Sequence, residues 1–494
     1  GVVWIEVADR GGELGATRAG VTGEAPSDVL WHYNLSARHL DKLCERVDTF
    51  SVSGDGERLV VRHRDDTIVV PSSHKVDDDD PAYIRVDLTR LRRTVNPRAE
   101  WRQMFDENGR LMASHYWRED MNGVDWDGVL NRYRPLVDLC HVVDDLHDIL
   151  WETVAELNTS HSYVSASGAA GDSDMRAGLL GADVSSGNDG AKVVRVIPGE
   201  SSDPRAWSPL RAAGVAVTEG DVIVAVDGRK VGADGNLGEL LEGSAGRVVE
   251  LTVRRGENER QVAVVPMADE APLRYHDWVA SRRRYVEEHS GGRLGYLHVP
   301  DMVSDGWAEL HRQIGEATRH EGVIADVRFN HGGHTSQLVV ERLARRVVGW
   351  DYSRWYATAD TYPQNAVRGP IVMVTNQWAG SDGDIVAAAT QAMGYAKVIG
   401  ERSWGGVVGI DGRFDLVDGT SVTQPRYAGW YGSYGWGVEN HGVDPDIVVT
   451  VSPEDWEADR DVQLDAAIAE CLRQLDDKPA ATAPELPGPA FDRC

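Results

Sequence analysis

The chain has 494 residues, of which 41% are hydrophobic and 26% charged. These proportions are typical of globular proteins and exclude disorder of the whole chain, and the length predicts several domains. The formal net charge of −28 repels phosphates and anionic membranes, and no basic patch offsets it. We therefore expect neither nucleic acid nor membrane as a partner.

Membrane spans, secretion signals and disulfides are also not expected. No run approaches the roughly 18 apolar residues that a spanning helix needs, and the first residues lack the regions of a secretory signal. The chain is therefore predicted to be cytoplasmic. Cys44, Cys140, Cys471 and Cys494 lie far apart without a CxxC pair, which predicts reduced thiols rather than a zinc site or disulfides.

The first segment predicts an antiparallel meander. Residues 47–71, VDTFSVSGDGERLVVRHRDDTIVVP, alternate β-rich runs with turns at 54–56 and 65–66. Such a small meander leaves open edges. We therefore expect residues 1–88 to be part of a larger β structure.

A helical region follows the meander. Residues 96–157 change to apolar spacings of three and four, and then stop at NTSHSYV, where β-branched and aromatic residues begin. This change predicts that Ser160 and His161 lie between a helix end and a strand. The Gly-, Ser- and Ala-rich run 165–178 is interpreted as a linker.

The next region resembles a PDZ domain. The resemblance is carried by GVAVTEGDVIVAVDG, residues 214–228, among short strands broken by turns. It implies a groove for a peptide terminus, with a carboxylate-binding loop that includes Leu180 and Gly181. A PDZ fold that acts only as a spacer or gate remains the alternative.

After Met267 the pattern becomes α/β. The strands are predicted at 294–300, 322–329 and 370–376, and at AKVIGE; helices are predicted at 307–320, at 336–348 and from about residue 384. Crossover helices indicate a parallel or mixed sheet, in which ligands bind beyond the carboxyl ends of the strands. The loops NHGGH and NQWAGSDGD lie at two such ends.

Two features of these loops suit acyl-transfer chemistry. Gly332 and Gly333 permit close backbone approach, so their amides can form an oxyanion hole, although a plain turn also uses such glycines. Ser381 has two interpretations. With Asp384 it matches a capping box, but a nucleophile at a helix start also gains from the helix dipole, and the Asp382 amide can join the oxyanion hole.

A serine nucleophile needs a base. His161 suits neutral pH better than Lys397, and Glu439 in the turn GVENHG can orient it and stabilise its charged form. A structural histidine and a solvated glutamate are the alternatives for these two residues.

Taken in order, these motifs resemble the tricorn protease family. They are AELNTSHSYV, the PDZ segment, DVRFNHGGHTSQLVVERL, NQWAGSDGDI, GERSWGGVVGI, DGTSVTQPRYAGW and GVENHGVDPDI, and they span the chain from about residue 40. The resemblance implies a multidomain α+β fold: a β-propeller remnant (1–88), a helical C1 domain (89–174), a PDZ domain (175–268), a crotonase-like C2 α/β protease core (269–480) and a flexible tail (481–494).

Site roles follow from the same resemblance. Ser381 is implied as the nucleophile, His161 as the base, and Ser160 as the link from the base to Glu439. The amides of Asp382 and of the Gly332–Gly333 turn are implied as the oxyanion hole. No metal or cofactor is implied, because His331 and His334 lack further ligands in their motif.

The resemblance extends to tail-specific C-terminal processing proteases, which use a serine–lysine dyad. Their lysine lies in a stretch similar to GERSWGGVVG, but Gly406 stands at the corresponding position here. The missing lysine favours the tricorn arrangement.

The sequence thus predicts a serine peptidase that cleaves oligopeptides through an acyl-enzyme. Asp351 and Asp360 are candidates for an acidic wall of the pocket for the residue preceding the cleaved bond (P1). The resemblance implies a hexamer that takes peptides from a proteasome-like protease and passes products to aminopeptidases. The alternatives are a non-catalytic PDZ scaffold, a C-terminal processing protease and a crotonase-like acyl-CoA enzyme.

Overall fold

The computed structural model describes residues 1–7, 27–63, 66–92, 94–166, 175–232, 236–486 of the chain. The expected linker (165–178) and tail (481–494) therefore lie partly outside the described residues. The chain divides into two compact units, residues 1–95, 179–240 and 246–273 in the first, and residues 96–178, 241–245 and 274–494 in the second. In the described ranges no helix is both long enough and apolar enough to cross a membrane.

The N-terminal part of the first unit is all antiparallel strand, as the meander predicted. A three-stranded sheet contains β1 (Val2–Glu6), β2 (Val29–Asn34) and β3 (His39–Glu45), and a four-stranded sheet contains β4 (Thr49–Val52), β5 (Arg58–His63), β6 (Asp66–Pro71) and β7 (Ile84–Val86). A short 3₁₀ turn, η1 (Leu88–Arg90), follows. Buried residues of both sheets, including Leu30 and Leu59, belong to one core.

The rest of the first unit is the PDZ-like segment. Its sheet has the order β14-β13-β11-β10-β9, with β12 beside β11. The elements are β9 (Ala182–Gly187), β10 (Gly190–Val196), η4 (Pro209–Arg211), β11 (Val222–Val226), β12 (Arg229–Lys230), α5 (Leu237–Leu240), β13 (Val249–Arg255) and β14 (Asn258–Val264). Strand β9 therefore forms one edge of the sheet.

The second unit begins with a helical region. Its elements are α2 (Pro97–His115), η2 (Met121–Gly123), α3 (Trp126–Val137), α4 (Val143–Ala155) and the short strand β8 (Val164–Ser165). Asn96 caps α2 through the Ala99 amide (3.3 Å) and Asp125 caps α3 through the Gly128 amide (3.0 Å). Short polar side chains at these positions satisfy amides that the first helical turn leaves free.

A parallel sheet forms the centre of the second unit, in the order β15-β16-β19-β20-β24. Its strands are β15 (Leu294–His298), β16 (Gly322–Asp326), β19 (Ile371–Thr375), β20 (Ala396–Gly400) and β24 (Ile447–Val448). Every residue of the first three is buried, as expected of a parallel sheet covered on both faces.

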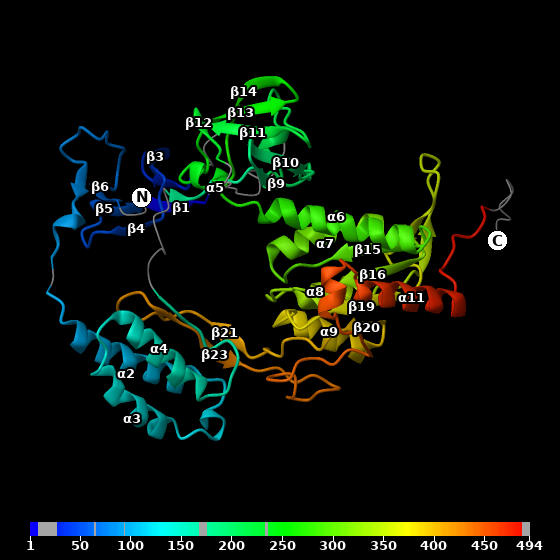
Figure 1. Ribbon diagram of the computed structural model, residues 1–494. Helices are drawn as coiled ribbons and strands as arrows, with labels where there is room; N and C mark the ends of the chain where they lie inside the picture. The colour runs from blue at the N-terminus through cyan, green and yellow to red at the C-terminus, as the bar shows by residue number, and fades with distance from the viewer. Residues whose placement is uncertain (8–26, 64–65, 93, 167–174, 233–235, 487–494) are drawn as a thin grey trace. The chain divides into compact units, whose positions relative to one another are not determined.

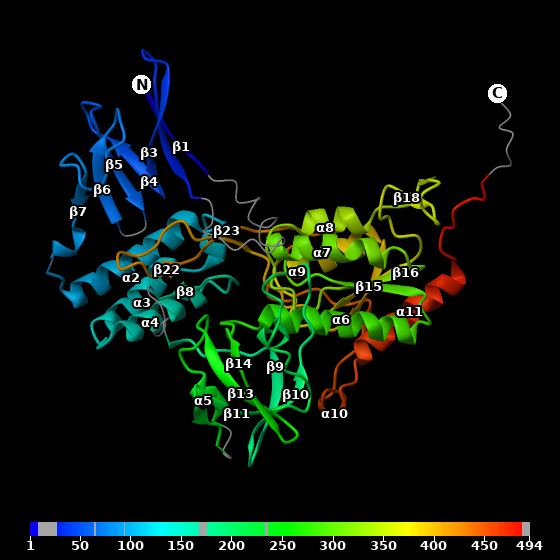
Figure 2. The ribbon, with the colours of Figure 1, turned by 90° about the horizontal axis from the view of Figure 1, so that it is seen from above.

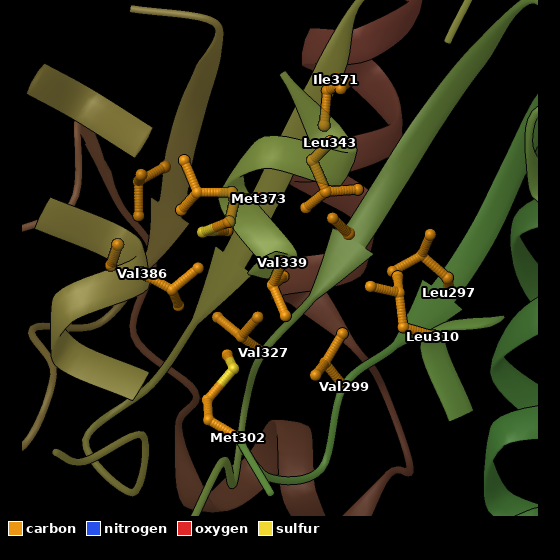
Figure 3. Packing of buried hydrophobic residues seen from close by; sticks show 14 of the residues in the cluster. Leu297, Val299, Met302, Leu310, Val327, Val339, Leu343, Ile371, Met373 and Val386 are labelled. Carbon is orange, nitrogen blue, oxygen red and sulfur yellow. The ribbon is translucent and has the colours of Figure 1, made fainter. Parts of the chain in front are cut away.

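Helices cover both faces of this sheet (Figures 1 and 2). One face packs against α7 (Ser304–Ala317), α8 (Ser336–Leu343) and α9 (Asp382–Met393), and the other against α6 (Ala271–His289) and α11 (Val462–Asp477). Figure 3 shows Val339 of α8 and Val386 of α9 directed at Met373 of the sheet. This packing fixes the start of α9 at the carboxyl end of β19.

The remaining elements of the second unit are small. They are the hairpin β17 (Gly349–Asp351) and β18 (Asp360–Tyr362), the strands β21 (Gly409–Asp411), β22 (Ser421–Val422) and β23 (Gln424–Tyr427), and α10 (Pro453–Glu457). Helix α8 ends at Leu343, five residues before the predicted end at 348. Arg346 instead pairs with Val367 in an isolated bridge.

Candidate active site

Ser381 lies in a sharp turn between β19 and α9. Its backbone angles are φ 57° and ψ −120°, a region that non-glycine residues occupy only under strain. Turns of this kind present a nucleophile at the top of an α/β sheet. The residue also starts a helix, whose positive dipole end stabilises negative charge nearby.

The capping interpretation of Ser381 does not fit this geometry. Its side chain makes no capping hydrogen bond to α9. The Asp384 carboxylate interacts with the Ser381 backbone, as one half of a capping box would, but it mainly accepts hydrogen bonds from Ser403, Gly405 and Gly406. Ser381 Oγ itself has no hydrogen-bond partner within the described ranges.

The glycine loop packs directly against this turn. Gly332 has φ +75°, and its amide donates to Asn330 Oδ1 at 2.9 Å. Gly333 has φ +146°, and a β-carbon there would lie 2.2 Å from the Met302 carbonyl oxygen. Both positions therefore require glycine.

Two amides near Ser381 remain without an acceptor in the described part of the chain. They are those of Gly333 and Asp382, since neither donates a backbone or side-chain hydrogen bond there. The Gly332 amide is already engaged. Unpaired amides beside a nucleophile are the donors that an oxyanion needs.

The segment with His161 is fixed to the C-terminal domain by backbone pairing. Strand β8 pairs with β22 in antiparallel register. Next to this ladder, the Tyr163 amide donates to Thr423 Oγ1 at 2.7 Å, and Asn440 Nδ2 donates to the Asn158 carbonyl at 2.7 Å. These contacts bring together residues separated by more than 250 positions in the chain.

Ser160 connects His161 to Glu439. Its hydroxyl lies 3.0 Å from Glu439 Oε2 and 3.0 Å from His161 Nδ1, and its amide donates to Glu439 Oε1 at 2.7 Å. A carboxylate only accepts, so the hydroxyl proton points to Glu439. His161 Nδ1 must then carry a proton, which leaves Nε2 as the basic nitrogen.

Glu439 is held by further amides. Val407 and Val408 donate to its Oε2 at 2.8 and 2.9 Å. A carboxylate surrounded by fixed donors stays in one position. Its charge in turn favours the protonated form of His161.

Burial lowers the pKa of His161 below its ordinary value, whereas the Glu439 charge and the Val408 backbone raise it by a smaller amount. The imidazole is therefore neutral at pH 7, as a general base requires. The rings of Tyr163 and Trp404 lie edge-on to it, with centroids 5.7 and 5.4 Å away. These aromatic rings cover part of the half-buried imidazole.

His161 and Ser381 line one pocket of about 470 Å³. The other lining residues are Tyr163, Asn330, His331, Gly333, Trp378, Gly380, Trp404 and Ile410. No hydrogen bond joins Ser381 to His161 in the described structure. In unliganded enzymes this contact is often long and tightens only with substrate.

Other candidate residues lie elsewhere. Asp351 and Asp360 face each other across the β17–β18 hairpin, and neither lines this pocket. In the first unit, the Gly181 amide donates to Glu270 Oε2 at 3.2 Å and the Leu180 carbonyl accepts from Ser208 Oγ at 3.0 Å. The carboxylate-binding loop implied by the PDZ resemblance thus already holds a carboxylate from its own chain.

The sequence did not point to several residues that shape the site. Asn330 joins both loops, because its Oδ1 holds Gly332, its Nδ2 donates to Val299, and its carbonyl accepts from Gly380 at 3.0 Å. Its only sequence signal is its place before HGGH. Trp404 lies in GERSWGG, where no feature of the sequence distinguishes it from a surface tryptophan.

Three segments match protein families. Residues 97–155 match the tricorn protease C1 domain, 178–269 the tricorn protease PDZ domain and 293–449 peptidase family S41. The solved crystal structure of the tricorn protease superposes with a TM-score of 0.86 at 33% identity, over 96% of this chain and 46% of that chain. The chain belongs to the tricorn protease family.

Curated members of the tricorn family agree over nearly the whole chain. Tricorn protease homolog 1 of Streptomyces coelicolor is 55% identical over 99% of this chain and 46% of its own length. Tricorn protease of Thermoplasma acidophilum is 35% identical over 92% of this chain and 42% of its own length. The chain therefore spans less than half the length of these relatives. The family assignment and the multidomain α+β fold predicted from the motifs are confirmed.

Proposed function

We propose that this chain is a serine peptidase that cleaves peptides through an acyl-enzyme. Ser381 attacks the carbonyl carbon of the substrate, and His161 Nε2 takes the serine proton and passes it to the leaving amine. Water then attacks the ester, again with His161 as base. The observation that carries this proposal is the strained turn at Ser381, which shares a pocket with a histidine that Ser160 links to the Glu439 carboxylate.

Two amides stabilise the negative oxygen of the tetrahedral intermediate in this proposal. They belong to Gly333 and Asp382, whose donors are free, while the Gly332 amide is engaged by Asn330. Gly332 instead provides clearance beside the nucleophile. Removing a single such donor costs on the order of 10²–10³ in kcat in serine proteases.

Covalent labelling tests the proposal directly. The chain is treated with a fluorophosphonate, and the adduct is located by peptide mass mapping. We expect one adduct at Ser381, absent in Ser381→Ala and strongly reduced in His161→Ala. A folded wild-type chain that forms no adduct would contradict the peptidase assignment and favour the PDZ-scaffold alternative, which predicts peptide binding without turnover.

The pocket lining supports an apolar P1 residue. Tyr163, Trp378, Trp404 and Ile410 supply its side-chain walls, and no carboxylate lines it. We therefore expect fluorogenic peptides with Phe at P1 to be cleaved with a higher kcat/KM than those with Arg. Faster cleavage after Arg, reduced by Asp351→Asn or Asp360→Asn, would instead support the acidic wall.

The physiological setting follows from the family likeness alone. We propose that the enzyme acts in the cytoplasm as a homo-oligomer, expected to be a hexamer, in the stepwise degradation of peptides between a proteasome-like protease and aminopeptidases. Light scattering of the purified chain measures the assembly. A monomer with full activity would remove assembly as a requirement for catalysis.

A further inference from the structure

Asp384 is a buried carboxylate on the nucleophile helix that the proposed mechanism does not use. It lies three residues after Ser381, is 0% exposed, and faces the segment 403–406. Its Oδ1 accepts from Ser403 Oγ at 2.5 Å and from the Gly405 amide at 2.8 Å, and its Oδ2 accepts from the Gly406 amide at 3.2 Å. Desolvation of such a group is costly, so a purely structural role would be served as well by apolar packing.

The segment that Asp384 holds continues directly to the acid of the relay. Directly after Gly406, the Val407 and Val408 amides hold Glu439 Oε2. The Gly406 amide, which is bonded to Asp384, is therefore followed directly by the two amides that hold Glu439.

The same segment also carries a ring that contacts the base. The Trp404 ring lies edge-on to His161 at 5.4 Å, and its amide donates to the Ala379 carbonyl at 3.0 Å, next to the nucleophile turn. A β-carbon on Gly380 would lie 2.7 Å from this ring. The ring therefore packs between the base and the backbone that precedes Ser381.

We propose that Asp384 is a positioning residue for this catalytic centre: its carboxylate fixes segment 403–408 to the nucleophile helix and so sets the place of Glu439 and His161 relative to Ser381. This inference rests on the proposed peptidase function. In this proposal the Asp384 side chain links Ser381, at the start of α9, to the Glu439–His161 pair, which reaches the site from other parts of the fold.

Protonation of Asp384 would weaken this connection, because a carboxylic acid is a poorer acceptor for two amides and a hydroxyl. Burial raises the pKa of Asp384 to about 6, although the hydrogen bonds from Ser403, Gly405 and Gly406 and the backbone of Ser381 lower it. Tyr431, from the loop after β23, faces Asp384 and also lies near Asp382 of the same helix. Burial raises the pKa of Tyr431 to about 12, so this tyrosine stays neutral below pH 10.

Three other titratable residues contact segment 403–408 rather than Asp384 itself. Glu439 accepts from the Val407 and Val408 amides, the His161 ring lies against Trp404, and His441 lies beside Gly405. Burial also raises the pKa of Asp382, whose carboxylate accepts from the Ser336 amide rather than from this segment. Protonation of Asp382 therefore does not break the bonds between Asp384 and segment 403–406. Asp382 is also unchanged in every variant compared below, so its contribution to the pH dependence is common to all of them.

The test is the pH dependence of kcat/KM for Asp384→Asn, using the peptide substrate with Phe at P1. Asn places an NH₂ donor against donors, so at least one bond is lost, and we expect kcat to fall by roughly tenfold to a hundredfold with KM little changed. The decisive readout is the slope of log(kcat/KM) against pH on the acid side of the profile, called the acid limb below. We expect a steeper limb below about pH 6 in the wild type than in Asp384→Asn, because the variant loses one titrating group.

Two further variants keep the test falsifiable. Asp446→Asn is a matched control, since Asp446 also holds a backbone amide, that of Val398 at 2.8 Å, but in the middle of β20 and with no bond to segment 403–408. Its kinetics and acid limb should match the wild type. If Asp384→Asn does not fold, Ser403→Ala removes the hydroxyl bond to Asp384, together with the bond that the Val443 amide donates to Ser403 Oγ at 2.8 Å, and leaves the Gly405 and Gly406 bonds in place. Because the hydroxyl bond lowers the pKa of Asp384, the acid limb of Ser403→Ala should move to higher pH.

The failure of this inference is distinct from failure of the proposed function. If wild type and Asp446→Asn cleave peptide while a folded Asp384→Asn retains wild-type kcat and slope, the positioning role is wrong and the peptidase stands. An unchanged acid limb in Ser403→Ala would also overturn it. If the wild type neither cleaves peptide nor labels at Ser381, both proposals fall together.

Discussion

Gly332 lies so close to Ser381 that a β-carbon on the glycine would be 2.5 Å from the β-carbon of the serine. Gly332→Ala should therefore displace Ser381. If Ser381 acts as proposed, we expect a loss of at least about a hundredfold in kcat/KM, in line with a misplacement of about 1 Å. Gly412→Ala is the control, because a β-carbon there meets nothing within 4 Å. Equal activity of the two variants would contradict the close packing.

The backbone strain at Ser381 makes a prediction that separates chemistry from stability. Ser381→Ala and Ser381→Gly should both lose turnover, by about 10⁶-fold if the residue is the nucleophile. Glycine occupies φ 57°, ψ −120° without strain, so Ser381→Gly should be about 1 kcal/mol more stable than Ser381→Ala. Urea unfolding measures this difference. A less stable Gly variant would argue against strain at this turn.

Glu439→Gln tests the relay. The glutamine amide cannot accept from Ser160, Val407 and Val408 together, because one of its two groups is a donor. We expect kcat to fall by about 10²–10⁴, less than for Ser381→Ala, because proton transfer to His161 itself remains available. The loss should appear in kcat with KM nearly constant. A variant that changes only KM would assign Glu439 to substrate binding.

In the proposed mechanism the pKa of His161 sets the pH range of activity. Burial lowers it below the ordinary value of 6.5, so the imidazole is neutral at pH 7 and becomes protonated only as the pH falls through the lowered value. The kcat/KM should therefore be independent of pH between about 7 and 8 and fall on the acid side. Chloromethyl ketone labelling of His161 should follow the same curve. Activity that declines from pH 8 to pH 7 would contradict the lowered pKa.

The sequence predicted the central sheet well but not every helix around it. The predicted strands at 294–300, 322–329 and 370–376 correspond to β15, β16 and β19, because fully buried parallel strands read as continuous apolar runs. Helix α6 was not predicted. Among its charged residues, Leu273, Val279 and Val286 are too far apart to form a clear helical period, and tertiary packing determines it.

For the candidate site, the sequence predicted which residues take part but not the direction of their hydrogen bonds. The glycine pair and the serine stood out in the sequence. Which glycine amide is free depends on Asn330, a side chain whose hydrogen bond to Gly332 has no signature in the chain. The place of Asp384 depends likewise on a segment about twenty residues away. Its spacing from Ser381 resembled a capping box, but burial directs it to segment 403–406.

The pairing of β8 with β22 determines the order in which this molecule would lose its activity on heating. The segment of His161 is attached to the C-terminal domain by a ladder of two residue pairs, a few side-chain bonds and the packing of Leu416 and Val422 into the core of the helical region. Ser381, by contrast, starts a helix packed on a fully buried sheet. A short ladder opens at lower temperature than a core. Heat inactivation should therefore precede cooperative unfolding, and the first intermediate would be a folded protease core that has released its histidine.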